Sequence, residues 1–272
     1  MRHRLLPAGL ILTMANVACA ASWHVSMAWD ILNKGLSDSN VEHRRQAVLA
    51  AASIGATAEA LKIIEAALLN DKTTLVRQTA AAALGQMKVR ESIPSLQQAL
   101  DDNTEVSFTA AKALWDMGDT SGRFILQQLL TGERSDRPGF IEQNLKNAKK
   151  KLTPAQLAMM GINEASGVLL GPASMGIIAA EEAIKGGKSG QPSGRPIAVG
   201  MLAEHPDDYT RPLLEWALTD KHSAVRAAAA KGLGQCGNAE SIPKLQSLWN
   251  EDHAAVRYMA AASVIRLSAG MP

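Results

Sequence analysis

A stretch of about thirty residues recurs along this chain, a length typical of helical repeat units. One copy, VRQTAAAALGQMKVRESIPSLQQAL, begins at Val76, and another, VRAAAAKGLGQCGNAESIPKLQSL, begins at Val225. A third copy starts at Val106, a partial copy starts at Val256, and a looser copy covers residues 44–68. This periodicity predicts a solenoid, in which each unit buries its apolar side against its neighbours.

Each unit reads as two helices. The first carries small residues at helical spacing, from Ala80 to Leu84, so neighbouring backbones can approach closely. The second starts near Pro94, where a preceding serine can cap the helix and proline suits the first turn. Aromatic residues make up only 4% of the chain, while alanine and leucine are frequent, which favours helix over strand. We therefore expect an all-α fold.

Acidic and arginine residues recur at fixed places in these units. An acidic residue lies five positions before each repeat valine, and an arginine directly follows three of those valines, with Ser107 as the exception. The resulting motif is acid-x4-V-R-x2-A-A-x-A-L-G. Its polar members are Asp71, Asp101, Asp220 and Glu251, with Arg77, Arg226 and Arg257.

This motif resembles that of the HEAT-like repeat proteins, in particular the short repeats named after the phycobilisome lyases. The resemblance covers residues 37–133 and 195–270 and implies an α-α superhelix of the ARM/HEAT type. It also implies that the polar members of the motif hydrogen-bond between adjacent repeats, so we expect them to be structural. If the C-terminal unit caps the stack, deletion of residues 240–272 should unfold the neighbouring repeats.

The first twenty residues have the pattern of a secretory signal peptide. Arg2 and Arg4 precede an apolar stretch that ends in an A-x-A site formed by Ala18 and Ala20. We expect a bacterial protein that is cleaved after Ala20 and exported to the periplasm or the medium. Two alternatives stay open: a short buried first helix, and a lipoprotein acylated at Cys19.

The remaining chain divides into three expected segments: N-terminal repeats at 21–133, a helical insertion with a Gly/Ser/Pro linker at 134–194, and C-terminal repeats at 195–272. Within the insertion, residues 140–152 read as a basic amphipathic helix. Residues 165–180 carry no charge, but Gly-Pro interrupts them and they are too short for a membrane span. They read as a helical hairpin against the solenoid, or as a hairpin that contacts a membrane or partner. Membrane contact thus stays open for the N-terminus and residues 140–185.

Motifs for catalysis or metal binding are absent from the sequence. There is no HExxH and no Cys/His cluster with zinc spacing. One HEAT-like family, deoxyhypusine hydroxylase, binds di-iron through His-Glu pairs, and this chain has no His-Glu dipeptide. Loss of residues 1–20 would lower the formal charge from +2 to 0, so the charge does not support nucleic-acid binding. We expect no cofactor and no nucleic-acid partner.

The resulting functional expectation is a non-enzymatic scaffold or adaptor of the cell envelope that binds other proteins on its second helices. The alternatives are a membrane-attached lipoprotein, an envelope assembly factor, and a HEAT-like enzyme or enzyme subunit of the lyase or hydroxylase type. Polar residues that point away from the apolar stripe of each second helix are the candidate partner contacts. They are Gln97, Gln98, Gln127, Gln128, Gln246 and Ser247.

Overall fold

The computed structural model describes residues 9–131, 195–204 and 206–270, and in these ranges all regular elements are helical. The expected all-α solenoid is confirmed. The N-terminal helices are α1 (Gly9–Leu36), α2 (Val41–Ile54), α3 (Ala58–Asn70), α4 (Thr74–Met87), α5 (Ile93–Gln98), α6 (Thr104–Asp116) and α7 (Arg123–Thr131). The C-terminal helices are α11 (Arg195–Glu204), α12 (Thr210–Ala217), α13 (Ser223–Cys236), α14 (Ile242–Gln246) and α15 (Ala254–Ala269).

The small residues of the motif form the core, as the sequence predicts. Ala80, Ala81 and Leu84 are fully buried in α4, and Leu96 and Leu245 are fully buried in the second helices α5 and α14. Short 3₁₀ turns at Arg90–Ser92 and Ala239–Ser241 lead into these two second helices, each of which has proline in its first turn.

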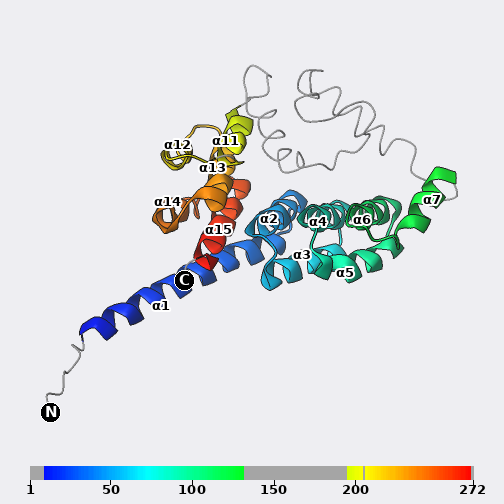
Figure 1. The fold of residues 1–272 in the computed structure, drawn as a ribbon, viewed down its shortest axis with the longest axis horizontal. Helices are drawn as coiled ribbons and strands as arrows, with labels where there is room; N and C mark the ends of the chain where they lie inside the picture. The colour runs from blue at the N-terminus through cyan, green and yellow to red at the C-terminus, as the bar shows by residue number, and fades with distance from the viewer. Residues whose placement is uncertain (1–8, 132–194, 205, 271–272) are drawn as a thin grey trace, which may run out of the picture.

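The order of the repeats in space differs from their order in the chain. The first helices of the repeats lie side by side in the sequence α11, α13, α15, α2, α4, α6, so the C-terminal group packs on the N-terminal group (Figure 1). The Ser263 hydroxyl of α15 donates to the Ala230 carbonyl of α13 at 2.8 Å, and Arg266 of α15 donates to the Ser53 carbonyl of α2 at 3.1 Å. Helices α7 and α11, which precede and follow the undescribed residues 132–194 in the chain, thus belong to repeats at opposite ends of the stack.

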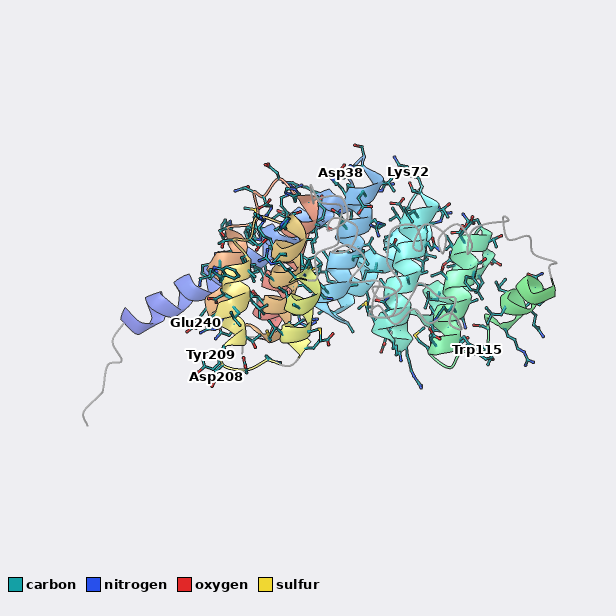
Figure 2. The ribbon with its side chains drawn as sticks, turned by 90° about the horizontal axis from the view of Figure 1, so that it is seen from above. Asp38, Lys72, Trp115, Asp208, Tyr209 and Glu240 are labelled. Carbon is teal, nitrogen blue, oxygen red and sulfur yellow. The ribbon has the colours of Figure 1, made fainter. Side chains whose placement is uncertain are left out.

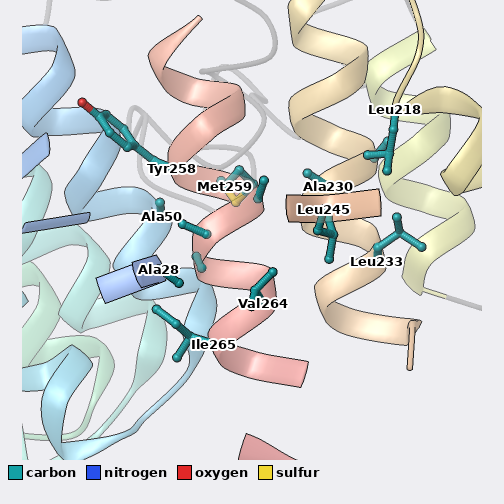
Figure 3. Close-up of a cluster of buried hydrophobic side chains, with 14 of the residues drawn as sticks. Ala28, Ala50, Leu218, Ala230, Leu233, Leu245, Tyr258, Met259, Val264 and Ile265 are labelled. Carbon is teal, nitrogen blue, oxygen red and sulfur yellow. The ribbon is translucent and has the colours of Figure 1, made fainter. Parts of the chain in front are cut away.

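Helix α1 completes the repeat that α15 begins. It contacts both α15 and α2, just as the second helix α3 contacts α2 and α4. Ala28 and Leu32 of α1 are fully buried, and Tyr258 and Ile265 of α15 belong to the same apolar cluster (Figure 3). One repeat is thus assembled from both ends of the chain.

This arrangement corrects the idea that the C-terminal unit caps the stack. Helix α15 lies between α13 and α2, away from either end. The physical reason is its composition: residues on all sides of α15 are buried, from Ala254 to Ile265 apart from Arg257, and a helix that is apolar all round must lie inside a structure.

The last glycine of the motif marks the closest approach between neighbouring first helices. A Cβ on Gly85 would lie 2.6 Å from the Ala113 Cβ of α6, and a Cβ on Gly234 would lie 2.8 Å from the Ser263 Cβ of α15. Both distances are shorter than carbon atoms tolerate, so the spacing of the stack depends on glycine at these places.

The expectations for residues 140–152 and 165–180 lie outside the described residues and stay predictions. None of the helices in the described ranges is long and apolar enough to cross a bilayer.

We expect Gly234→Ala to lower the free energy of unfolding by about 1–3 kcal/mol, because the added methyl group would push α13 away from α15. Gly200→Ala in α11 is the matched control, since a Cβ there meets no atom within 4 Å. It should be neutral or stabilise by up to about 1 kcal/mol. Urea unfolding followed by circular dichroism compares the two variants, and equal effects would contradict the tight contact at Gly234.

Candidate functional site

A series of arginine–carboxylate pairs joins successive repeats. Each arginine lies on a first helix and reaches the loop before the next first helix in the stack. The Arg44 Nε lies 2.7 Å from Asp71 Oδ2, and the Arg77 Nε lies 2.6 Å from Asp102 Oδ2, each with a second bond from Nη2 to the other carboxylate oxygen. In the C-terminal group the pairs are Arg195 with Asp220 and Arg226 with Glu251.

The same arginines also tie down their own loops. The Arg77 Nη1 donates to the Asp71 carbonyl at 2.8 Å, and the Arg226 Nη1 donates to the Asp220 carbonyl at 2.7 Å. One guanidinium thus fixes the loop before its own helix and the loop before the next, which suits its rigid, multiply donating group. These contacts make the motif's arginines part of the stacking.

Most of the residues expected to join adjacent repeats form ion pairs between repeats. Asp71, Arg77, Asp220, Arg226 and Glu251 all make pairs of this kind.

Asp101 is a correction: Arg77 pairs with its neighbour Asp102, because a 3₁₀ turn at Ala99–Asp101 brings the second carboxylate of this acidic pair to the guanidinium. Arg44 and Arg195 also belong to the series. A shared spacing of 25–27 residues between arginine and acid was the sequence signal for them.

Arg257 is different, because it lies where the two ends of the chain meet. Its Nη1 donates to the carbonyl oxygens of Glu251 and Asp252, and its guanidinium lies 5.7 Å from the centre of the Tyr258 ring. The acid in the equivalent place in the next loop, Asp38, accepts instead from the Nδ1 of His43 at 2.9 Å. Among the described residues, no ion pair of Arg257 with a carboxylate is recorded.

The paired carboxylates have depressed pKa values. Burial alone would raise the pKa of Asp102, but hydrogen bonds from Arg77 and from the Asn103 backbone outweigh it, and the net shift is downward. Asp71 is held in the same way by Arg44 and the Thr73 backbone. These groups are stabilised as anions and suit structural ion pairs better than proton transfer.

The candidate partner residues do not form one continuous row. Gln97, Gln98, Gln127 and Gln128 lie on α5 and α7 of adjacent repeats, whereas Gln246 and Ser247 lie at the end of α14, beyond α3 and α1 in the stack.

Gln97 and Ser247 are among the candidates that bond within the protein. The Gln97 Nε2 donates to Ser121 Oγ of the next repeat at 3.2 Å, and the Ser247 hydroxyl donates to the Lys244 carbonyl at 2.7 Å. No described group accepts from the buried Nε2 of Gln246. Partner binding by the whole set stays a prediction.

A more distinctive surface lies on α12, in the repeat at the C-terminal group's open end. Tyr209, the N-cap residue of α12, and Leu213 and Trp216 within the helix are 75%, 48% and 66% exposed and follow the spacing i, i+4, i+7, so they share one side. We call these three residues the α12 face. An adjacent side of the helix is buried through Thr210, Leu214 and Ala217.

Comparison between repeats shows that this face is unusual. When Pro212 is aligned with Pro94 and Pro243, Trp216 corresponds to Gln98 and Ser247, and Leu213 corresponds to Ser95 and Lys244. Polar positions of internal repeats are thus aromatic or aliphatic in α12. Solvent-exposed aromatic residues at helical spacing are typical of a binding surface. The sequence held a signal for this site. EWAL at 215–218 aligns with QQAL at 97–100, which places Trp216 at a position of the candidate polar row.

Ion pairs hold α12 against the next repeat. The Glu215 carboxylate accepts from Ser241 Oγ at 3.0 Å and from Lys244 Nζ at 2.5 Å, and Arg211 bonds Glu240. These contacts fix the helix, so the α12 face is presented by a rigid element. Tyr209, Asp208 and Glu240 gather at one edge of the solenoid, opposite the edge that carries Asp38 and Lys72 (Figure 2).

In the described part of the chain, no group of three or more His, Cys, Asp or Glu side chains is arranged to hold a metal ion. His253, which recurs with His222 in the loops, lies with its Nδ1 3.0 Å from Glu251 Oε1, beside the Arg226 pair.

The comparisons with known proteins agree with the prediction of HEAT-like repeats. A family model described as HEAT repeats matches residues 64–139 and 181–266. A search among curated proteins finds no match. Among solved structures, the chain is similar to human deoxyhypusine hydroxylase in complex with glycerol, with 18% identity, a TM-score of 0.34, and coverage of 91% of this chain and 98% of that chain.

The last match corrects the expected function. We expected a non-enzymatic scaffold or adaptor, and a chain that is not an enzyme; the similar structure is that of an enzyme, so both expectations are wrong against this comparison. At 18% identity and a TM-score of 0.34, this similarity carries no hydroxylase activity over to this chain.

We expect Asp102→Asn to destabilise the protein by about 1–2 kcal/mol, since a charge-assisted pair with Arg77 is lost. Asp101→Asn is the matched control and should stay within about 0.5 kcal/mol. Because the pKa of Asp102 is lower in the folded state, its stabilising effect is complete above about pH 4 and disappears as the pH falls through the folded pKa. Urea unfolding at pH 7 and below pH 3 should show the difference between the variants shrinking at acid pH.

Proposed function

Since this chain belongs to the HEAT-repeat family, we propose that it recognises another polypeptide, and that the α12 face is the recognition site. The observation that carries the proposal is the replacement of polar residues by Tyr209, Leu213 and Trp216 on a rigid helix at the open end of the stack. Polypeptide recognition is compatible with an enzyme as well as with a binding protein, because a bound polypeptide can be either a substrate or a partner.

Three features support this site. Tyrosine and tryptophan are the residues that most often dominate binding energies at protein interfaces. Tyr209, at one end of the α12 face, lies on the edge of the solenoid opposite Asp38 and Lys72 (Figure 2). Ser241 and Glu240, on the 3₁₀ turn Ala239–Ser241, already bond Glu215 and Arg211, so the polar groups of the helix are engaged beside its exposed apolar side chains.

Site-specific cross-linking tests the proposal. A photoreactive phenylalanine analogue at Leu213 should give discrete adducts with an identified protein in the source cells. The same analogue at Ser95, the equivalent place on α5, is the matched control and should give few. Equal adducts at both places, or none at Leu213 in a folded chain, would overturn the α12 site.

We propose further that the chain is exported. Three residues of α1 are buried among those whose burial is described, Ala28, Leu32 and Gly35, and all lie after Ala20, so cleavage there would leave them in the chain. The basic, apolar and A-x-A parts of residues 1–20 are the support for this proposal.

Mass spectrometry of the protein from its source cells should find an N-terminus at Ala21. A chain acylated at Cys19 would instead establish the lipoprotein alternative, in which the protein is anchored to the envelope. A chain that retains Met1 or residues directly after it would contradict export by this route.

A further inference from the structure

We propose that the polypeptide recognised by the α12 face is an amphipathic helix with basic residues beside its apolar stripe, and this rests on the function proposed above. The first step is the shape of the site. Tyr209, Leu213 and Trp216 form a single stripe along one short helix. A stripe of this kind matches a second helix that presents apolar residues at i, i+3 or i+4 and i+7.

The second step is the charge around the stripe. Residues 195–220, which form this repeat, contain five acidic residues and two arginines, a formal charge of −3. Asp208 is exposed directly beside Tyr209, and Glu240 of the next repeat is exposed at the same edge (Figure 2). Glu240 is paired with Arg211, so Asp207 and Asp208 supply the net negative charge at the Tyr209 end of the stripe.

The third step is that nearby basic groups are already engaged. Arg211 bonds Glu240 and donates from Nη1 to Asn238 Oδ1 at 3.2 Å, and Lys244 bonds Glu215. Arg195 pairs with Asp220 away from the stripe, in the loop before α13. Basic residues on a bound helix would thus meet net negative charge at the Tyr209 end, and an acidic helix would be repelled.

The same charge argues against an anionic membrane as the occupant. Aromatic side chains suit a lipid interface, but anionic headgroups attract basic surfaces, and the surroundings of Tyr209 are acidic. A basic helix satisfies both the aromatic stripe and the carboxylates.

The test is fluorescence anisotropy with the full chain and two labelled helical peptides of about 15 residues, one of leucine and lysine and one of leucine and glutamate in the same pattern. We expect the lysine peptide to bind at least about tenfold more tightly than the glutamate peptide. Trp216→Ala should weaken the lysine peptide by about tenfold or more, because it removes a central aromatic contact. Trp115→Ala, which changes another exposed tryptophan on α6, is the matched control and should bind as the parent chain does.

A charge-reversed variant, Asp208→Lys, provides the second arm, because it changes an exposed carboxylate and leaves the Arg211–Glu240 pair in place. It should lose the preference for the lysine peptide and gain affinity for the glutamate peptide. Equal binding of the two peptides to the parent chain, binding unaffected by Trp216→Ala, or Trp216-dependent binding to vesicles of anionic phosphatidylglycerol would each overturn the proposal.

The outcome separates this proposal from the function it rests on. If neither peptide binds while Leu213 still cross-links to a cellular protein, the helix chemistry is wrong and the α12 site stands. If the peptides show no dependence on the α12 face and the cross-links are absent as well, both proposals fail.

Discussion

The contact between α15 and its neighbours is the one on which the whole solenoid depends. Ala260, Ala261 and Ala262 are fully buried, and their small side chains let α15 lie close to α13, α2 and α1 at once. Without the contacts of α15, the C-terminal helices and the N-terminal helices would each expose an apolar surface that neither group can cover by itself. The arginine–carboxylate pairs align the repeats, but the burial of alanine-rich surface holds them together.

Much of the fold could be predicted from the sequence, because the repeat motif states the local structure directly. The helical pairs, the buried Leu84 and Leu96, and the structural use of Arg77 and Arg226 follow from residues that recur. The order of the stack could not be predicted in this way. The order depends on α1, which occupies the place of a second helix but does not share the second-helix motif. It also depends on α15, which has no polar side.

The candidate site was harder to predict for a related reason. A search for a recurring polar row finds the residues that repeats share, whereas Trp216 matters because it departs from Gln98 and Ser247. A tryptophan within an apolar sequence is predicted to be buried, and only the structure shows that the Trp216 side chain is exposed. Similarly, the difference between Asp101 and Asp102 rests on one 3₁₀ turn, which a spacing rule does not resolve.

The repeat shared by α1 and α15 has a consequence for the way the chain is made. A ribosome releases α1 first and α15 last, so the N-terminal helices wait through the synthesis of the rest of the protein with the site for α15 open. The bond from Arg266 to Ser53 spans 213 residues, and contacts of such range form late, because a large loop must close before they stabilise anything. The repeats from α2 to α6 can assemble as soon as they emerge, but the stack becomes continuous only when the final helix arrives.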